Sequence, residues 1–366
     1  MRPSWIEIDP AAVRSNVASM VELVGTAQVC AVVKADGYGH GDVPVAEAAL
    51  EAGATFLAVA LVEEAIRLRE AGIEAPILVL SEPALEDVPE LLRWSITPTV
   101  YRHAMLERLL EVVSRGHLDV HLKVDTGMHR VGADGDRTLQ LAMRLADGGL
   151  PVRMAALWTH FAVADTDPSF TAQQIGAFTD VVELLADRGI AVPMQHLANT
   201  AGAILHPGAR RDMVRVGLGV YGLYPSEPCR PHIQLTPAMR VVSHVSMTRR
   251  LPAGARPSYG RRRPLERPST VATAPIGYAD GVPRMLSQRG GTVLIGGVAH
   301  PFAGTVTMDQ IVVDVGDHPV RVGDEVVLIG GQGSGMIGAD DWADRTETIN
   351  YEIVTRMGSR LPRRYL

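Results

Sequence analysis

Short apolar runs of strand length alternate with helix-length segments through the first 216 residues. Such alternation indicates a parallel sheet, and eight strand–helix units over roughly 200 residues match a (β/α)8 barrel better than a doubly wound sheet, which usually has fewer strands. The expected strands are 29–33, 56–60, 76–80, 95–99, 118–124, 155–160, 194–197 and 213–216. The expected helices are 10–24, 42–52, 62–71, 84–93, 101–115, 135–147, 169–188 and 200–205.

Beyond residue 222 the pattern changes to short β-rich runs separated by proline and glycine, which predicts a second, mostly β domain. We expect a barrel domain over 1–235 and a β domain over 236–366, with residues 1–8 available to pair with the latter. The strands expected there are 239–248, 270–274, 292–295, 311–315 and 325–329.

Two further segments of the second domain have less specific patterns. The glycine-rich run Gly330–Gly335 lacks the Lys-Ser/Thr of a phosphate loop and is expected to be a flexible turn. The three arginines Arg261–Arg263 are expected to be a solvated loop.

Charge and composition narrow the class of partner. A net charge of −6 and a pI near 6.1 argue against a nucleic acid as the main ligand and favour a small molecule. No apolar run reaches the roughly 18 residues of a membrane span, so we expect no membrane partner and a cytoplasmic protein. Cys30 and Cys229 form neither a CxxC site nor a disulfide framework, and no metal site is expected.

Lysine is almost absent from the chain. Of the 35 lysine and arginine residues, only Lys34 and Lys123 are lysine, and Lys34 stands at the end of the first buried strand. Arginine stays cationic, whereas a partly buried lysine can become a neutral amine and act as a nucleophile or base. The two lysines are therefore candidates for chemistry.

In a barrel of this type, chemistry takes place at the carboxyl ends of the strands. A reactive lysine there indicates a Schiff base, either with a substrate carbonyl, as in class I aldolases, or with pyridoxal phosphate. A phosphate site in the loops after strands 7 and 8 favours pyridoxal phosphate. Backbone amides are available in these loops at Asn199-Thr200 and at Gly217-Leu218-Gly219. The polar residues at strand ends are Lys34, Lys123, Asp125, His160, Asn199 and Arg215.

Six motifs together resemble the alanine racemase family, in the family's order and across nearly the whole chain. They are Lys34-Ala-Asp-Gly-Tyr-Gly-His-Gly41, Lys123-Val-Asp-Thr-Gly-Met128, Trp158-Thr-His-Phe-Ala162, Arg215-Val-Gly-Leu-Gly-Val-Tyr-Gly222, Ile276-Gly-Tyr-Ala-Asp-Gly281 and Met308-Asp-Gln310. The resemblance implies an N-terminal barrel, a C-terminal β domain, the cofactor pyridoxal 5'-phosphate, and a homodimer whose sites are completed by the partner subunit.

The resemblance also implies a two-base mechanism for interconverting L- and D-alanine. Lys34 is similar to the lysine that holds the cofactor and acts as one base, and Tyr259 resembles the second base, contributed by the other subunit. Two bases on opposite faces of a planar carbanion are what inversion requires. Arg215 resembles the arginine that faces the pyridine nitrogen, and His160 resembles the residue that links this arginine to Tyr259.

Further roles follow from the same resemblance. Lys123 matches a position that is carbamylated in some members and supports the neighbouring arginine, here Arg130. The residues implied for the cofactor are Lys34, Tyr38, Asn199, Thr200, Arg215, Gly217, Leu218 and Tyr351. The residues implied for the amino-acid substrate are Arg130, Tyr278 and Met308.

The chain departs from the family pattern at three places, one of which, Thr200 instead of the common serine, keeps the hydroxyl. Thr305 stands where the family usually has an arginine that lines the entry corridor, and Arg261–Arg263 follow Tyr259-Gly260, where small or aromatic residues are usual. The departures leave open a racemase for serine or a larger amino acid, and a cofactor-binding relative with weak or no turnover. A third alternative is a barrel-type decarboxylase, which also places a cofactor-binding lysine in a barrel. Arg215 argues against the decarboxylase, which needs a carboxylate at the pyridine nitrogen.

Overall fold

A computed structural model of the chain describes residues 2–114, 116–146 and 149–366. By its contacts the chain divides into two compact units, which we call the barrel unit and the β unit. The barrel unit comprises Ala11–Gly37 and Asp42–Thr236, and the β unit comprises Met1–Pro10, Tyr38–Gly41 and Pro237–Leu366. Residues 115 and 147, where two expected helices end, lie outside the described residues.

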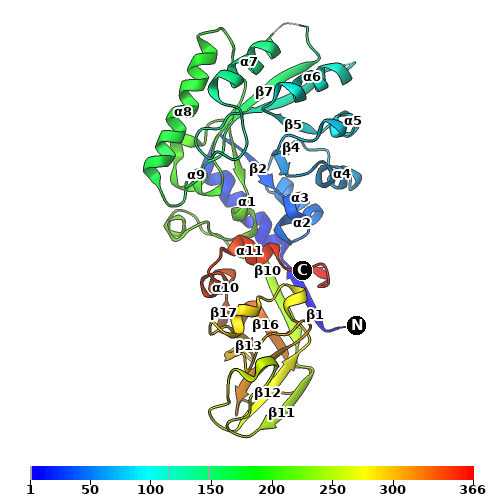
Figure 1. The fold of residues 1–366 in the computed structure, drawn as a ribbon, viewed down its shortest axis with the longest axis vertical. Coiled ribbons are helices and arrows are strands. Elements are labelled where there is room, and N and C mark those ends of the chain that lie inside the picture. The colour runs from blue at the N-terminus through cyan, green and yellow to red at the C-terminus, as the bar shows by residue number, and fades with distance from the viewer. Residues whose placement is uncertain (1, 115, 147–148) are drawn as a thin grey trace. The chain divides into compact units, whose positions relative to one another are not determined.

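The barrel unit contains eight parallel strands surrounded by helices (Figure 1). Strands adjacent in the chain pair with one another from β2 to β8, and the last strand, β9, pairs with β2. Backbone bonds from Arg215 N–H to Ala198 O (2.9 Å) and from Asp212 N–H to Gln195 O (3.1 Å) join the ends of β8 and β9. The predicted (β/α)8 barrel is confirmed. The strands are β2 (Gln28–Val32), β3 (Phe56–Val59), β4 (Ile77–Val79), β5 (Thr97–Val100), β6 (Leu118–Lys123), β7 (Val152–Trp158), β8 (Gln195–His196) and β9 (Met213–Val216).

Most residues of the barrel strands are buried, as their largely apolar runs predict. In β4 all three residues, Ile77, Leu78 and Val79, are buried. The long helix α8 begins with an Asp167 cap, whose carboxylate accepts the Phe170 N–H at 3.0 Å. The helices are α1 (Pro10–Val24), α3 (Asp42–Glu51), α4 (Val62–Glu70), α5 (Val88–Arg93), α6 (His103–Val112), α7 (Gly135–Ala146), α8 (Pro168–Ala186) and α9 (Thr200–Leu205).

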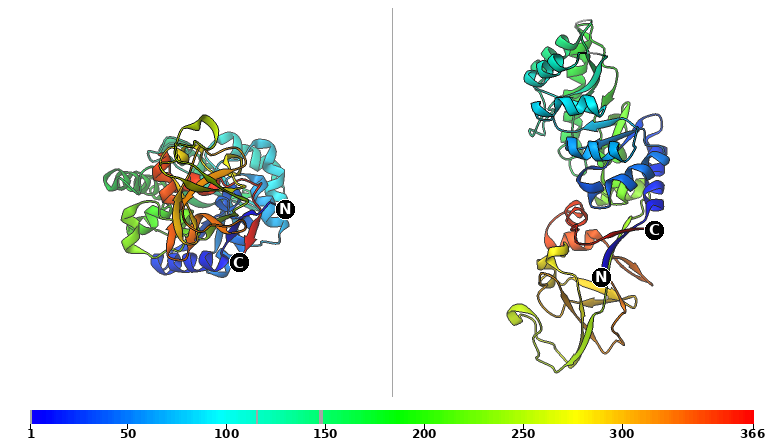
Figure 2. Two further views of the ribbon diagram at one scale, coloured as in Figure 1. Left: turned by 90° about the horizontal axis from the view of Figure 1, so that it is seen from below. Right: turned by 90° about the vertical axis from the view of Figure 1, so that its right-hand side faces the viewer.

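The β unit contains two sheets and two short helices, and Figure 2 shows it from two further sides with helices α10 and α11 in red. One sheet has the order β14-β13-β16-β10-β1-β18, with β17 paired to β16, and the other has the order β11-β12-β15. Its elements are β1 (Ser4–Ile8), β10 (Met239–His244), β11 (Met247–Leu251), β12 (Ser269–Ala274), β13 (Thr292–Ile295), β14 (Val298–Pro301), β15 (Ile311–Gly316), β16 (Glu325–Gln332), β17 (Gly335–Ile337), β18 (Arg363–Tyr365), α10 (Ala339–Thr346) and α11 (Asn350–Thr355). Within the described ranges, no helix has the length and apolar character needed to span a bilayer.

Both ends of the chain belong to the larger sheet of the β unit. Strand β1 runs antiparallel to β10, with Trp5 opposite Val242, and parallel to β18. The Leu366 N–H donates to the Ile8 carbonyl oxygen at 3.0 Å. The first and last strands are therefore neighbours in one sheet.

The expected strand 239–248 is divided between the two sheets of the β unit. The chain leaves β10 at His244 and enters β11 at Met247, and each residue between them bonds to a different sheet. Val245 N–H donates to Asp324 O and Ser246 N–H donates to Thr273 O, both at 2.8 Å. The apolar pattern continues from β10 into β11, so the sequence alone does not indicate that the chain passes from one sheet to the other here.

The glycine run Gly330–Gly335 is a β-hairpin, so the prediction of a flexible turn was wrong. Gly330 pairs with Ile337 and Gly331 pairs with Met336, and only the residues at the tip lie outside the strands. Gly330 has φ 113°, and a Cβ there would lie 2.6 Å from Cγ of Arg240, which explains the absence of a side chain.

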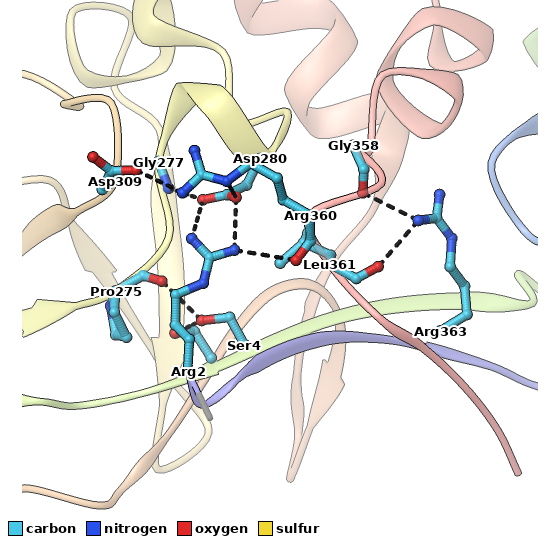
Figure 3. A network of polar contacts seen from close by, with 11 residues as sticks. Arg2, Ser4, Pro275, Gly277, Asp280, Asp309, Gly358, Arg360, Leu361 and Arg363 are labelled. Atoms are coloured by element: carbon cyan, nitrogen blue, oxygen red, sulfur yellow. Dashed lines mark hydrogen bonds and ion pairs between the residues drawn. The ribbon is translucent and has the colours of Figure 1, made fainter.

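A buried carboxylate ties three segments of the β unit together (Figure 3). Asp280 is fully buried and accepts a bidentate pair from Arg2, at 2.9 and 2.7 Å, as well as the Gly277 N–H at 2.9 Å. Arg360 approaches the same carboxylate at 3.4 Å and also pairs with Asp309 at 2.6 Å. The network therefore fixes the loop that contains Asp280 to both the first and the last segments of the chain.

The same loop is bonded to the segment that contains Met308. Tyr278 N–H donates to Thr307 O at 2.9 Å, and Ala279 N–H donates to Met308 O at 3.1 Å. A Cβ at Gly277 would lie 2.3 Å from Thr307 O, so only glycine allows this approach. The Asp280 network thus holds Tyr278 and Met308 in one arrangement.

Removing the charge of Asp280 should destabilise the protein strongly. We expect Asp280→Asn to lower the free energy of unfolding by about 3 kcal/mol, because it breaks a buried ion pair with bonds to both arginine and backbone. Urea unfolding measures this change. Asp317→Asn is the control, since its pair with Arg250 is more than half exposed and should be worth at most about 1 kcal/mol. Equal effects of the two substitutions would contradict the prediction.

Candidate functional site

Lys34 lies at the carboxyl end of β2 and starts a left-handed helical turn, α2 (Lys34–Tyr38). Ala35, Asp36 and Tyr38 have φ values of 54°, 54° and 51°, in a region that costs an L-residue about 1–2 kcal/mol. The sequence predicted a glycine-containing loop, and the positive φ values of the three non-glycine residues were not foreseen. Backbone strain of this kind persists only where surrounding contacts impose it, and it is concentrated at functional sites.

Glu64 is one of the contacts that impose this turn. Its carboxylate accepts the Ala35 N–H at 2.6 Å, and its other oxygen accepts the N–H groups of Ala60 and Leu61, at the start of α4, at 2.8 and 3.1 Å. Glu64 is buried and also acts electrostatically on Lys34, whose pKa it raises slightly against larger opposing effects. The contact joins residues 29 positions apart in the chain, so no local sequence pattern indicates it.

The two lysines and Arg130 form one electrostatic cluster in the barrel unit. Burial lowers the pKa of Lys34, and Arg130 lowers it further. Burial also lowers the pKa of Lys123 to about 7, with Arg215 and Arg130 acting in the same direction. Lys123 is 4% exposed, and its Nζ lies 4.2 Å from the ring centroid of Trp158. Both amines are therefore shifted toward the neutral, reactive form.

Arg215 is a buried cation, 3% exposed, at the carboxyl end of β9. Its guanidinium donates to the carbonyl oxygens of Thr159, His196 and Leu197 at 2.7–3.0 Å, and to Nδ1 of His196 (2.9 Å) and His160 (3.3 Å). None of these partners is a carboxylate. Burial lowers the pKa of Arg215 to about 10, so the guanidinium remains charged at neutral pH.

These bonds determine the tautomers of the neighbouring histidines. Because Arg215 can only donate, Nδ1 of His160 and of His196 must accept, and each ring carries its proton on Nε2. His196 Nε2 then donates to Nδ1 of His121 at 3.0 Å. Burial first, and Arg215 second, lower the pKa of all three rings, that of His121 to about 3. His121 and His196 were not predicted as part of the site, although both are buried in strands of the barrel, β6 and β8.

The loops after β8 and β9 are bonded to each other through Thr200. Its hydroxyl oxygen accepts the Gly217 N–H at 3.0 Å, which leaves the hydroxyl proton able to donate elsewhere. Asn199 caps α9 by accepting the Gly202 N–H at 2.8 Å. Leu218 is fully buried, so only its backbone can contact a ligand.

The remaining predicted site residues lie in the β unit. Tyr38 is buried, which raises its pKa to about 12, and its ring lies 6.2 Å from that of Tyr351. Three large side chains from separate loops are instead exposed: Tyr259 at 74%, Met308 at 52% and Tyr278 at 42%. Exposed aromatic and methionine side chains on ordered loops are typical of binding surfaces.

Thr305, which stands where the family usually has a corridor arginine, is buried within the β unit. It is 3% exposed, and its hydroxyl donates to the Tyr259 carbonyl oxygen at 2.9 Å. Its short side chain thus bonds to the backbone of the segment where the second base is expected.

Comparison with known proteins identifies the family. The model "Alanine racemase, N-terminal domain" matches residues 8–225, and "Alanine racemase, C-terminal domain" matches residues 238–365. The chain belongs to the alanine racemase family. Members of this family depend on pyridoxal phosphate.

Curated relatives and solved structures of the family match over the full chain. An alanine racemase of Frankia casuarinae is 42% identical over 98% of this chain and 95% of its own, and one of Halothermothrix orenii is 41% identical over 100% and 97%. The crystal structure of alanine racemase from E. faecalis has a TM-score of 0.94 at 38% identity, covering 100% of this chain and 98% of that one. The structure from Bacillus anthracis, with bound L-Ala-P, has a TM-score of 0.93 at 34% identity, covering 100% and 95%.

The buried histidines should make the protein sensitive to mild acid. The pKa of His121 is about 3 in the folded chain and near 6.5 when unfolded, so the unfolded state binds more protons between these values. Stability is thus present above about pH 6.5 and is lost as the pH falls toward 3, by up to about 1.4 kcal/mol per pH unit for each such histidine.

Urea midpoints at pH 7 and 5.5 test this dependence. His121→Gln keeps an acceptor for His196 but cannot take up a proton, so we expect a shallower loss of stability on acidification. His103→Gln, on the exposed surface of α6, should retain the pH dependence of the parent protein. A parent midpoint that does not change between the two pH values would contradict the argument.

Proposed function

We propose that this chain is a pyridoxal-phosphate-dependent racemase that interconverts L- and D-alanine. The observation that carries the proposal is the pair Lys34 and Arg215: an amine with a lowered pKa at one strand end, and a buried guanidinium with no carboxylate among its partners at the end of the neighbouring strand. Membership of the family and full-length identity near 40% support alanine as the substrate.

The donor set fits the cofactor. Lys34 would supply the amine that holds the cofactor's aldehyde, and Arg215, being cationic, would keep the pyridine nitrogen unprotonated. When bound, the cofactor withdraws electrons from the substrate and makes its α-proton acidic. In the barrel unit, the side-chain and backbone donors that would hold its phosphate belong to Asn199, Thr200, Gly217 and Leu218.

Racemisation needs a base on each face of the α-carbon. Lys34 serves one face, and Tyr259 of the partner subunit serves the other, which makes the active form a homodimer. His160 accepts from Arg215 through Nδ1, so its Nε2–H is a donor that can hold the phenol oxygen of that tyrosine. The fixed tautomer thereby favours a phenolate, the form that can remove a proton.

The substrate carboxylate is bound by Arg130 and by Met308 and Tyr278 of the partner subunit. Lys123 supports Arg130 after carbamylation, in which the neutral amine adds to CO2 and releases one proton, leaving a negative carbamate. A pKa of about 7 provides the neutral amine that this addition requires. The carbamate converts a repulsion between two cations into an ion pair.

The cofactor assignment is tested by absorbance and by substitution of the lysine. Purified protein with added pyridoxal phosphate should show an absorbance band at the edge of the visible range, and Lys34→Ala should abolish both this band and α-proton exchange on alanine. Arg153→Ala, at an exposed position of β7, is the control and should retain both. A parent protein that stays colourless with the cofactor would rule out the proposal.

The second base is tested by isotope exchange with solvent. Because L- and D-alanine have equal free energies, kcat/KM for racemisation is the same in both directions and cannot separate the two bases. We expect Tyr259→Phe to reduce racemisation by roughly 100-fold or more while one enantiomer still exchanges its α-proton in deuterated water through Lys34. Mass spectrometry of each separated enantiomer measures this. Equal loss of exchange from both enantiomers would argue that Tyr259 is not a base.

A further inference from the structure

Tyr259 stands at the tip of a closed loop in the β unit, residues 255–265, which we call the Tyr259 loop. Its neck is fixed by two backbone bonds of 2.8 Å, from Leu265 N–H to Ala255 O and from Gly254 N–H to Leu265 O. Leu265 is buried and packs in a small apolar cluster with Val271 and Ala303. The neck is therefore rigid, while the tip extends into solvent.

The tip has a conformation that its residues do not favour. Ser258, Gly260 and Arg261 have φ values of 67°, 74° and 46°, and only the glycine adopts such angles without cost. These residues flank Tyr259 on both sides. Contacts with other segments must therefore impose the position of this tyrosine.

The contacts come from the segment 302–305, which follows β14. Thr305 Oγ1 donates to the Tyr259 carbonyl oxygen at 2.9 Å, and Ser258 Oγ donates to the Thr305 carbonyl oxygen at 2.6 Å. We call this reciprocal pair the Ser258–Thr305 clasp. A Cβ at Gly304 would lie 2.3 Å from Pro257 O, so the clasp also depends on a glycine that lets the two backbones approach.

One loop arginine reinforces the clasp. Arg263 is half-buried and donates to the Phe302 carbonyl oxygen at 2.7 Å, beside the clasp. Within the loop, Arg256 donates to the Arg261 carbonyl oxygen at 3.1 Å. The prediction that Arg261–Arg263 form only a solvated loop was thus wrong for Arg263, whose bond joins the loop to the same segment as Thr305.

We infer that Thr305 is a positioning residue for Tyr259: its buried hydroxyl fixes the backbone of the second base, and hence the place that the phenol takes in the partner subunit's site. The inference rests on the proposed function. Thr305 acts from inside the β unit through a single short bond to the tyrosine's own carbonyl, and it need not touch substrate or cofactor. Because Tyr259 serves only one face of the substrate, loss of this bond has a stereochemical signature that a general loss of stability lacks.

The test compares Thr305→Val, which has the same shape without the hydroxyl, with Thr305→Ser, which keeps it. In the dimeric holoenzyme, Thr305→Val should lower the rate of racemisation by roughly 10- to 100-fold. Displacing a catalytic group by up to about 1 Å has an effect of this size. Exchange of the α-proton should decline more for the enantiomer that depends on Tyr259, the one identified with Tyr259→Phe. Thr305→Ser should restore both. Thr346→Val, which removes a similar hydroxyl-to-carbonyl bond in α10, is the control and should change neither.

A second measurement does not depend on catalysis. Amide hydrogen exchange of a peptide covering residues 256–263 should be faster in Thr305→Val than in the parent, and close to the parent in Thr305→Ser and Thr346→Val. Unchanged amide exchange, or equal decline of α-proton exchange for both enantiomers, would overturn the role of Thr305 while leaving the racemase itself intact. A parent protein without racemisation would instead refute the proposed function, and faster amide exchange in Thr305→Val would then show a loop contact only, without the positioning role.

Discussion

The burial of the Arg215 guanidinium inside the barrel is the constraint on which the rest of the site depends. A buried ion loses several kcal/mol of hydration, and Arg215 recovers this through carbonyl oxygens and imidazole nitrogens at the ends of neighbouring strands. With no carboxylate among these partners, its positive charge is not neutralised. Burial lowers the pKa of Lys123 and of His160, and this charge lowers both further, so the two groups are held toward their neutral forms. The protonation of these neighbours thus depends on burial together with one uncompensated charge.

The two units contribute different kinds of group. The barrel unit supplies charges and amines on rigid strand ends, where neighbouring strands fix their position. The β unit carries exposed side chains on loops, which are held by hydrogen bonds, by ion pairs and, at the neck of the Tyr259 loop, by the buried Leu265. Asp280 fixes the segments of Tyr278 and Met308, and Thr305 fixes that of Tyr259. Asp280 and Thr305 are both buried, although the side chains on the segments that they fix are exposed.

The sequence predicted the barrel well because buried parallel strands are uninterrupted apolar runs, a pattern that depends only on local residues. It predicted the β unit less completely, since short strands such as β14, β17 and β18 carry little pattern of their own. The left-handed turn at Ala35 and Asp36 is imposed by tertiary contacts, including the bond from Glu64, and those residue types do not signal it. His121 and His196 escaped notice for a similar reason, because only the folded barrel brings His196 on β8 into contact with His121 on β6 and with Arg215 on β9.

The expected roles of Lys34 and Tyr259 came from motifs, and a motif identifies a residue without showing which contacts fix its position. Those contacts are hydrogen bonds between positions far apart in the chain, such as Ser258 and Thr305, and no spacing rule predicts such a pair. For the same reason Thr305 was assigned to a corridor from its place in a motif. Its burial and its bond partner could be known only from the fold.

The arrangement of β1 between β10 and β18 has a consequence for how the protein is made. On the ribosome, residues 4–8 emerge first, yet their partners are residues 239–244 and 363–365, so the strand must wait through synthesis of the entire barrel. Its apolar side chains and unpaired backbone stay exposed during that interval, which is the condition in which strands pair wrongly. The larger sheet is therefore completed only after the segments that follow the barrel in the chain have been made.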